Sequence, residues 1–435
     1  MCAETPDYKA TLNLPKTDFP MRAGLPKREP GWLERWEKIG VYDRLREKEG
    51  REPFTLHDGP PYANGNLHIG HALNKTIKDM IVRSHQMMGY DARYIPGWDC
   101  HGLPIEWKIE EQYRKKGRDK DQVPINEFRA ECREFARGWV DVQREEFKRL
   151  GITGNWENPY LTMDFHAERV IAEEFMKFLM NGTLYQGSKP VMWSPVEKTA
   201  LAEAEVEYHD KESHTVWVKF KVVGTEGDLD GAQVVIWTTT PWTMPSNKAV
   251  VYGEGISYGL YEVTSTPDEC WANVGERFLL ADDLAADVFA RARLEDGMWS
   301  RVRGVENDEL AKISLLHPLA GAEGAEGEWD DLRDFRAADF VTSDEGTGFV
   351  HCAPSHGLEE YELYRDLGML PQVITYNVME DGRFRDDLPF FGGKAILKPN
   401  GKEGNANSAI IDKLVEVGGL LARGKIKHSY PHSWR

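Results

Sequence analysis

The sequence contains few cysteines and no closely spaced pair of them. Its 435 residues include five, scattered singly along the chain at Cys2, Cys100, Cys132, Cys270 and Cys352. An odd number of separated thiols excludes a disulfide framework. Reduced thiols of this kind are typical of a cytoplasmic protein.

Long apolar runs and an excess of positive charge are also absent. No stretch is apolar for the roughly 20 residues that a membrane-spanning helix requires, and the N-terminus has neither a signal core nor an Arg-rich presequence. We therefore expect a soluble protein without membrane contact. The 54 basic residues are outnumbered by 72 acidic ones, which gives a formal net charge of −18. This charge argues against a protein that coats nucleic acid indiscriminately, but it is compatible with a shaped nucleic-acid site.

The length of the chain predicts two or three domains. Residues 1–50 contain Pro-rich stretches and one amphipathic segment, Gly31–Ile39, and we expect them to pack as an extension on the next domain. Residues 51–198 alternate short apolar strands with long amphipathic helices. This alternation indicates βαβ units and hence an α/β domain with a mainly parallel sheet. The clearest helix is expected at Asn126–Leu150, where core packing explains the apolar stripe.

The texture of the sequence changes at about residue 199. Residues 199–420 are rich in short, β-branched strands separated by Gly-rich turns, which favours an inserted, β-rich mixed α/β domain. Two of these strands are expected at Thr215–Val222 and Val234–Thr240. Residues 421–435 stop abruptly, as in a truncated chain, and we expect them to return to the first domain.

The most informative segment runs from His57 to His71 and reads HDGPPYANGNLHIGH. A strand-like Phe54–Leu56 precedes it, and apolar residues recur at helical spacing from Ile69 onward. The segment therefore reads as strand, turn and helix. His68 and His71 can face the backbone N–H groups and the positive dipole end of that helix, where a polyphosphate would bind well. From the residues alone, a nucleotide site and a mere surface or capping role for the two histidines both stay open.

A second motif, Gly97–Glu106 with the sequence GWDCHGLPIE, follows another turn. Together the two motifs resemble the signature of the class I aminoacyl-tRNA synthetases, and among them the isoleucine-specific enzymes. Leucine- and valine-specific enzymes keep the HxGH element with different flanking residues. The resemblance implies an incomplete Rossmann-like catalytic domain in a monomeric cytoplasmic ligase. It also implies L-isoleucine, tRNA(Ile) and ATP as partners, with Mg²⁺ arriving with ATP.

The resemblance also assigns roles to individual residues of the two motifs. His68 and His71 are expected to contact the triphosphate, and Gly70 to let the adenine ring approach the helix backbone. Gly59 and Pro60 would shape the wall beside the amino acid. The nucleotide-binding motif as a whole comprises Pro61, Tyr62, Ala63, Asn64, Gly65, Asn66, Leu67, His68, Ile69, Gly70 and His71.

Asp99 is the expected partner of the substrate ammonium group, because a desolvated cation needs an acidic partner. A helix is expected to begin at about Pro104, within the second motif. On residue type alone, Asp99 could instead be the N-cap of that helix. The resemblance favours the ligand-binding role.

Isoleucine exceeds valine by one methylene, a difference for which this family is itself the standard example of weak discrimination by a hydrophobic pocket. The resemblance implies hydrolytic editing in the inserted domain, at Trp237–Asn247 and Gly346–Gly357. Thr238, Thr239 and Thr240 would line the pocket, and His351 would bound it to exclude the isoleucyl side chain. Glu360 stands where the family usually has an aspartate that grips the misacylated amino group. From residue type alone, the three threonines would instead be interpreted as part of a β-strand with no role in a site.

Two further features depart from the family pattern. The lysine-rich KMSKS signature is absent from residues 1–435, so we expect the chain alone to be inactive in aminoacylation. Thiols that flank the inserted domain in many relatives are missing at Trp193–Glu197 and His432–Trp434, so we expect no zinc. An editing or tRNA-binding module without ligase activity is the alternative function. A nucleotidyltransferase that acts without tRNA would leave the WTTTPWT and HCAPSH segments unexplained.

Overall fold

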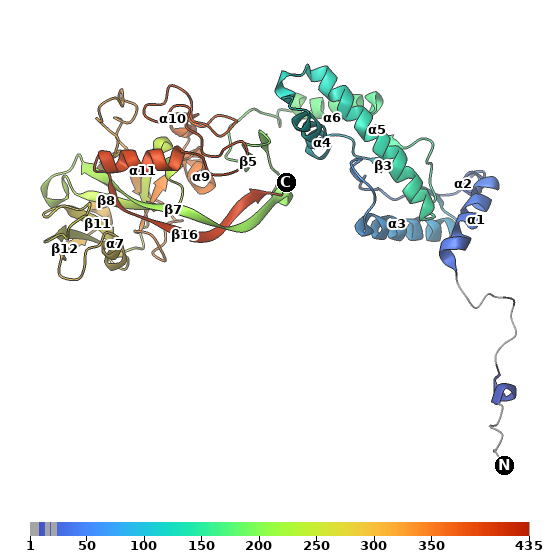
Figure 1. Ribbon diagram of the computed structural model, residues 1–435, viewed down its shortest axis with the longest axis horizontal. Coiled ribbons are helices and arrows are strands. Elements are labelled where there is room, and N and C mark those ends of the chain that lie inside the picture. Colours follow the sequence, from blue (N-terminus) through green and yellow to red (C-terminus); the bar gives the residue numbers. More distant parts are fainter. Residues whose placement is uncertain (1–7, 14–17, 19–23, 435) are drawn as a thin grey trace, which may run out of the picture. The chain divides into compact units, whose positions relative to one another are not determined.

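The computed structural model describes residues 8–13, 18 and 24–434 (Figure 1). Cys2 lies outside the described residues, and the other four cysteines are free thiols. The chain forms two compact units that divide between Tyr185 and Gln186. None of the helices in the described ranges combines the length and hydropathy of a membrane span.

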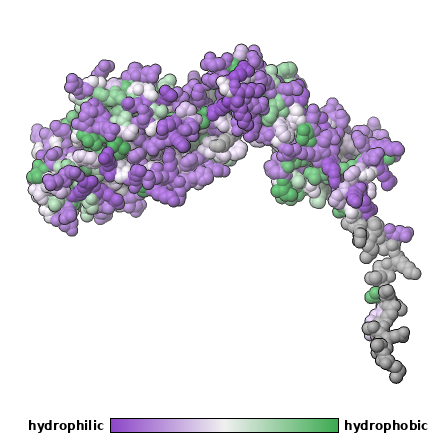
Figure 2. All heavy atoms as spheres, viewed as in Figure 1, coloured by the Kyte–Doolittle hydropathy of each residue, from purple (hydrophilic) through white to green (hydrophobic). Residues whose placement is uncertain are grey.

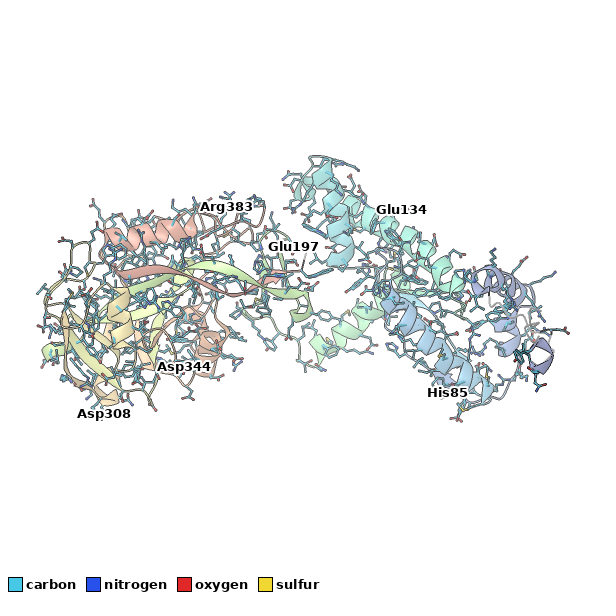
Figure 3. All side chains as sticks on the ribbon, turned by 60° about the horizontal axis from the view of Figure 1, so that its bottom comes forward. His85, Glu134, Glu197, Asp308, Asp344 and Arg383 are labelled. Carbon is cyan, nitrogen blue, oxygen red and sulfur yellow. The ribbon has the colours of Figure 1, made fainter. Side chains whose placement is uncertain are left out.

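Two parallel strand pairs form the centre of the first unit. β1 (Pro53–Thr55) pairs with β2 (Asp91–Arg93), and α3 (Ile69–Met87) connects them along the chain. β3 (Gly97–Trp98) pairs with β4 (Tyr160–Leu161), also in parallel. The βαβ arrangement predicted for this region is thus present. His85 of α3, labelled in Figure 3, stacks on Phe54 of β1 with ring centroids 3.6 Å apart.

Three longer helices belong to the same unit, and the first two of them pack on each other. They are α4 (Leu103–Lys115), α5 (Ile125–Arg149) and α6 (Phe165–Met180). The helix predicted at residues 126–150 corresponds to α5. Its apolar stripe contributes Cys132, Ala136, Val140 and Phe147 to the core, as the sequence predicted.

The apolar stripe of α3 behaves differently. The helix forms where its spacing predicted it, but Ile69 is 86% exposed and Leu73 is 62% exposed. The buried residues of α3 are instead Lys75 and Val82. Hydrophobic residues gather on the surface where Figure 1 places α3 and α6 (Figure 2).

The N-terminal segment packs on this unit through α1 (Leu25–Lys38), which is followed by α2 (Val41–Arg46). α1 begins earlier than predicted because Gly24 caps it in the left-handed region and proline is favourable in the first turn. The Arg83 guanidinium of α3 lies 5.2 Å from the Trp36 ring centroid. Arg149 donates to Glu29 at 2.9 Å. The described part of this segment thus contacts both α3 and α5.

A seven-stranded sheet forms the main layer of the second unit. Its order is β12-β10-β11-β8-β7-β13, and β16 also pairs with β7. All neighbours are antiparallel except β8 and β11. The strands are β7 (Val206–Val223), β8 (Gln233–Thr238), β10 (Tyr258–Val263), β11 (Arg277–Ala281), β12 (Trp299–Val305), β13 (Ser314–Leu316) and β16 (Leu420–Ser433).

A three-stranded sheet and several helices complete this unit. β9 (Ala249–Tyr252) lies between β14 (Asp334–Ala337) and β15 (Phe349–Cys352). The helices are α7 (Ala285–Arg291), α8 (Asn307–Leu310), α9 (Leu358–Asp366), α10 (Leu370–Val373) and α11 (Ala406–Glu416). The 3-10 turn η5 (Pro241–Ser246) follows β8. The β-rich mixed composition predicted here is present.

The ends of the second unit differ from the expected domain limits. The unit begins at Gln186 rather than after residue 198, and it includes residues 421–435. β16 extends into these last residues and pairs with β7 in an antiparallel ribbon that reaches Ser433 opposite Val206. We expected residues 421–435 to return to the first domain, but the division into compact units assigns them to the second unit.

The two thiol-free segments lie together near the end of this ribbon. They belong to the hairpin of β5 (Trp193–Ser194) with β6 (Thr199–Ala200) and to the end of β16. Ser433 Oγ donates to Glu197 Oε2 at 3.0 Å, and Ser194 Oγ accepts from the Glu197 N–H at 3.3 Å (Figure 3). Hydroxyl and carboxylate groups thus join the two segments.

Candidate functional site

The structure brings the two sequence motifs of the first unit together. The Ala63 N–H donates to the Asp99 carbonyl at 3.0 Å, and the Asp99 N–H donates to the Pro61 carbonyl at 2.8 Å. Tyr62 and Asp99 form a parallel bridge. The loop before α3 therefore runs beside the segment that follows β3.

His68 and His71 cap the N-terminus of α3. His68 is the N-cap, and its Nδ1 accepts from the N–H groups of Gly70 at 3.0 Å and His71 at 3.4 Å. His71 Nδ1 accepts from the His68 N–H at 3.3 Å. The two rings stack with centroids 3.8 Å apart. Because both Nδ1 atoms are acceptors, the proton of each neutral imidazole lies on Nε2.

This capping changes how an anion would meet the helix. The N–H groups of Gly70 and His71, which the sequence suggested would face a phosphate, already bond to the His68 ring. The remaining donors are the Nε2–H groups of His68 and His71. Burial, with smaller electrostatic contributions from His68 and Lys75, lowers the pKa of His71 and so favours its neutral form.

Gly70 is required by the packing of His68. A Cβ placed on Gly70 would lie 2.9 Å from Cε1 and 3.0 Å from Nδ1 of the His68 ring. Those separations are closer than normal van der Waals contact. The absence of a side chain at Gly70 therefore lets the capping imidazole sit over the first turn, whatever its role toward adenine.

Asp99 is not a helix N-cap. α4 is capped by Gly102, whose φ of 86° suits glycine. The half-buried Asp99 carboxylate accepts only the His101 N–H, at 3.4 Å, and forms no ion pair with the described residues. It is thus available to a ligand cation. Pro60 lies against the same strand, since a Cβ on Gly97 would be 3.5 Å from Pro60 Cβ.

Asp58 is a residue of this region that the sequence analysis missed. Its carboxylate accepts from Lys75, Lys78 and, at 2.7 Å, the Tyr94 hydroxyl. Burial opposes ionisation, but these hydrogen bonds hold the pKa of Asp58 below its usual value. Asp58 thereby anchors the chain immediately before Gly59. The available signal was two lysines three residues apart on α3, with Asp58 in the loop before the helix.

In the second unit, hydroxyl groups gather where β8 ends. Thr238 is the last residue of β8, so the three threonines do not form a continuous strand. The hydroxyls of Thr238 and Thr240 lie 3.1 Å apart, and the Thr240 N–H donates to Thr238 Oγ1 at 3.1 Å. Thr243 of η5 donates its hydroxyl proton to the Thr240 carbonyl at 2.8 Å. The Thr239 hydroxyl forms no hydrogen bond within the described chain.

His351 is brought to this group but is only 7% exposed. Its Nδ1 accepts from Asn247 Nδ2 at 2.9 Å, and its Nε2 lies 2.8 Å from Thr243 Oγ1. Burial lowers the pKa of His351 to about 3. His351 therefore supports the threonine loop as a neutral residue. Thr243 and Asn247 are the partners that the sequence analysis did not single out.

Glu360 belongs to α9 and forms no hydrogen bond or ion pair with the threonines or His351 in the described chain. Its carboxylate folds back over Gly357, where it occupies the space that a Cβ on that glycine would need. Burial raises the pKa of Glu360. The structure thus joins Thr238, Thr240 and His351 into one network and leaves Glu360 apart from it.

Comparison with known proteins defines the class to which this chain belongs. The family model described as tRNA synthetases class I (I, L, M and V) matches residues 31–379. The chain is therefore a member of the class I tRNA synthetases and contains their mixed α/β catalytic domain.

Named relatives narrow the similarity within this class. The chain is 79% identical over its whole length to an isoleucine–tRNA ligase of Ruegeria pomeroyi, of which it covers 44%. It is 55% identical over 99% of its length to an isoleucine–tRNA ligase of Brucella abortus, of which it covers 45%. The chain thus spans less than half the length of these curated relatives.

Solved structures give weaker similarities. One is a ternary complex of Agrobacterium radiobacter K84 agnB2 LeuRS with tRNA and LeuAMS, at 17% identity and a TM-score of 0.37, covering 95% of this chain and 49% of that one. The other is GlLeuRS-CP1, at 15% identity and a TM-score of 0.33, covering 48% of this chain and 99% of that one. Both scores are too low to establish a shared fold.

The His68 cap predicts opposite effects for two glycine substitutions in helices. Gly138→Ala in α5 meets open space and should raise the free energy of unfolding by about 1 kcal/mol, because alanine is the better helix former. Gly70→Ala should instead lower it by about 1 kcal/mol, because the new methyl group displaces the cap. Chemical denaturation of both variants measures the difference. Equal stabilisation by both substitutions would contradict the cap.

Buried neutral histidines predict a loss of stability in acid. Burial lowers the pKa of His356 to about 4 and that of His317 well below its usual value, as for His351. The unfolded chain therefore takes up protons below pH 6.5 that the folded chain does not. Each such histidine should cost about 2 kcal/mol of stability between pH 7 and pH 5.

Denaturation at the two pH values tests this with two variants. His351→Gln should remove about 2 kcal/mol of the pH-dependent loss because glutamine does not titrate. His209→Gln, at an exposed position of β7, should leave the loss unchanged and serves as the control. An identical pH dependence in His351→Gln and the unmodified chain would sink the assignment of a neutral buried imidazole.

Proposed function

We propose that this chain supplies the amino-acid activation site and the editing site of an isoleucine–tRNA ligase. The 79% identity to such a ligase across the whole chain carries this proposal. The first unit, from about residue 51, would activate isoleucine, and the inserted 199–420 region would hydrolyse Val-tRNA(Ile). The proposed partners are ATP, L-isoleucine and tRNA(Ile), in a monomeric cytoplasmic enzyme.

Activation would join the isoleucine carboxylate to ATP. A carboxylate oxygen bonds to the α-phosphorus while the bond from that phosphorus to the bridging oxygen breaks, and pyrophosphate leaves with the electron pair. Such transfers depend on positioning and charge stabilisation more than on covalent catalysis. The Nε2–H groups of the exposed His68 and the half-buried His71 suit the phosphate oxygens because they are donors at a helix N-terminus. Mg²⁺ would come with the triphosphate.

The unpaired carboxylate of Asp99 suits the α-ammonium group of isoleucine. The backbone pairing of Asp99 with Pro61 and Ala63 keeps this carboxylate beside the loop that leads to His68. Gly59 and Pro60 would form the neighbouring wall. Held this way, the ammonium group and the triphosphate would lie in one site, with the carboxylate of the amino acid between them.

Editing would use the hydroxyl groups that follow β8. Thr238, Thr239 and Thr240 would hold a water and the terminal adenosine by hydrogen bonds, without a strong nucleophile from the protein. His351 would limit the space behind them. The Glu360 carboxylate would grip the ammonium group of the misacylated valine, provided that its side chain unfolds from over Gly357.

Isoleucine-dependent exchange of pyrophosphate into ATP tests the activation site in the full-length product of the gene that encodes this chain. His68→Ala and His71→Ala should each lower kcat by about 10²-fold, as expected for the loss of a transition-state donor. His166→Ala, at an exposed position of α6, should leave kcat unchanged. Full-length protein without isoleucine-dependent exchange would contradict ligase activity and favour a module that only edits or binds tRNA. The 435-residue chain should give no exchange, because it has no KMSKS segment.

Deacylation of Val-tRNA(Ile) tests the editing site in the same full-length protein. Glu360→Ala should reduce the rate at least about 10²-fold, because the substrate ammonium loses its charged partner. Glu360→Asp, which restores the residue usual in the family, should stay active. Glu359→Ala is the matched control, because Glu359 directly precedes Glu360 in the sequence and its side chain is exposed. Unchanged deacylation in Glu360→Ala would contradict the role of this carboxylate.

A further inference from the structure

Gln143 connects the two motifs of the proposed activation site. It lies on α5, where Figure 3 labels Glu134, and it is 1% exposed. Its Nε2 donates to the carbonyls of Tyr62 at 3.0 Å and Gly65 at 2.6 Å. Its Oε1 accepts from Trp98 Nε1 at 2.9 Å. Both amide protons and the amide oxygen are thus used, and the three partners belong to the loop before α3 and to the strand before Asp99.

Glu146 lies one turn further along the same face of α5. Its Oε1 accepts from Asn66 Nδ2 at 2.6 Å, and its Oε2 accepts from the Leu67 N–H at 2.8 Å. Asn66 and Leu67 directly precede the N-cap His68. Glu146 therefore fixes the chain at the point where it enters the helix.

The loop has few other hydrogen bonds within the described part of the chain. Its backbone pairs with Asp99 only through Pro61 and Ala63. Every hydrogen bond that the structure gives to residues 64–67 comes from Gln143 or Glu146. Apart from the packing of Leu67 and Ala63 in the core, these two side chains are what positions the Gly- and Asn-rich segment that leads into His68.

α5 is a rigid base for the two side chains. Phe147, next to Glu146, is fully buried and stacks on Trp156 with ring centroids 5.9 Å apart. Val140 and Ala136 are buried on the same helix. Core packing thus fixes α5, and the polar pair transmits this fixed position to the loop.

We propose that Gln143 and Glu146 are positioning residues for amino-acid activation, which set the His68–His71 pair in register with Asp99. This inference rests on the proposed function. Gln143 holds the loop and the Asp99 segment as one body, and Glu146 sets where the helix begins. A displacement of about 1 Å between reacting groups costs about 10²-fold in rate, so a loop that shifts on α5 loses activation while each half-site keeps its shape.

Gln143→Met and Glu146→Gln test this in the full-length protein. Methionine keeps the volume of Gln143 but removes its hydrogen bonds. Glutamine at position 146 replaces one carboxylate oxygen by an NH₂ group, so either Asn66 Nδ2 or the Leu67 N–H faces a donor and loses its acceptor. Each variant should lower kcat for isoleucine-dependent exchange by about 10²-fold, with the KM values for ATP and isoleucine changed by less than about threefold. Each rate is divided by the concentration of active sites, which burst titration measures, so that a smaller folded fraction does not lower kcat. Gln112→Met and Glu145→Gln, at other positions of α4 and α5, are the matched controls.

Editing provides an internal control for folding. Val-tRNA(Ile) deacylation by Gln143→Met should equal that of the unmodified protein, because the threonine network belongs to the other unit. Parallel loss of exchange and deacylation would mean a general folding defect and would overturn the proposal. Full kcat in both variants, with exchange active in the unmodified protein, would overturn the positioning role and leave the proposed function standing.

Hydrogen exchange of the 435-residue chain tests the same contacts without activity. Amide exchange in residues 62–68 should accelerate at least about tenfold in Gln143→Met, while exchange in α5 stays unchanged, because only the loop loses its support. If the loop amides exchange at the same rate in both proteins, the proposal fails whatever the outcome for ligase activity.

Discussion

A buried carboxamide, that of Gln143, ties both motifs of the first unit to the same helix, α5. A buried amide is costly unless all its polar atoms find partners, and Gln143 satisfies each of them with a group from one motif or the other. The same condition that stabilises the fold therefore also holds the loop before α3. Any movement of Tyr62 or Trp98 away from α5 would leave a polar atom unpaired in the core.

The histidines at the start of α3 serve the helix before they serve any ligand. His68 and His71 close a reciprocal cap with their Nδ1 atoms, which holds both rings and directs both Nε2–H groups outward. A structural role and a phosphate-binding role are thus compatible, because Nδ1 of each ring accepts a hydrogen bond in the cap while Nε2–H stays available as a donor. The sequence left these roles as alternatives, and the tautomer implied by the cap is compatible with both.

Much of the local structure was predictable, and the long-range contacts were not. The apolar period of residues 126–150 determined both the helix and its buried face. The apolar spacing in α3 predicted the helix but not which of its residues are buried. Whether Ile69 and Leu73 are covered depends on which other segments pack against that face of the helix. Gln143 gave no signal, since a polar residue beside an apolar stripe looks like a boundary position. The pairing of β16 with β7 was missed for a similar reason: pairing partners far apart in sequence leave no local pattern.

Hydrogen-bond direction constrains the chemistry of the second unit more tightly than residue type does. Asn247 donates to His351 Nδ1, so His351 Nε2–H must donate to Thr243 Oγ1, whose own proton goes to the Thr240 carbonyl. Thr238 Oγ1 already accepts from the Thr240 N–H and can give its proton to Thr240 Oγ1. Two hydroxyl protons then remain for a ligand: that of Thr239, which has no partner in the described chain, and that of Thr240, whose oxygen lies 3.5 Å from Thr243 Oγ1. The neutral histidine, too buried to act as a base near pH 7, thereby fixes the direction in which the Thr243 hydroxyl donates.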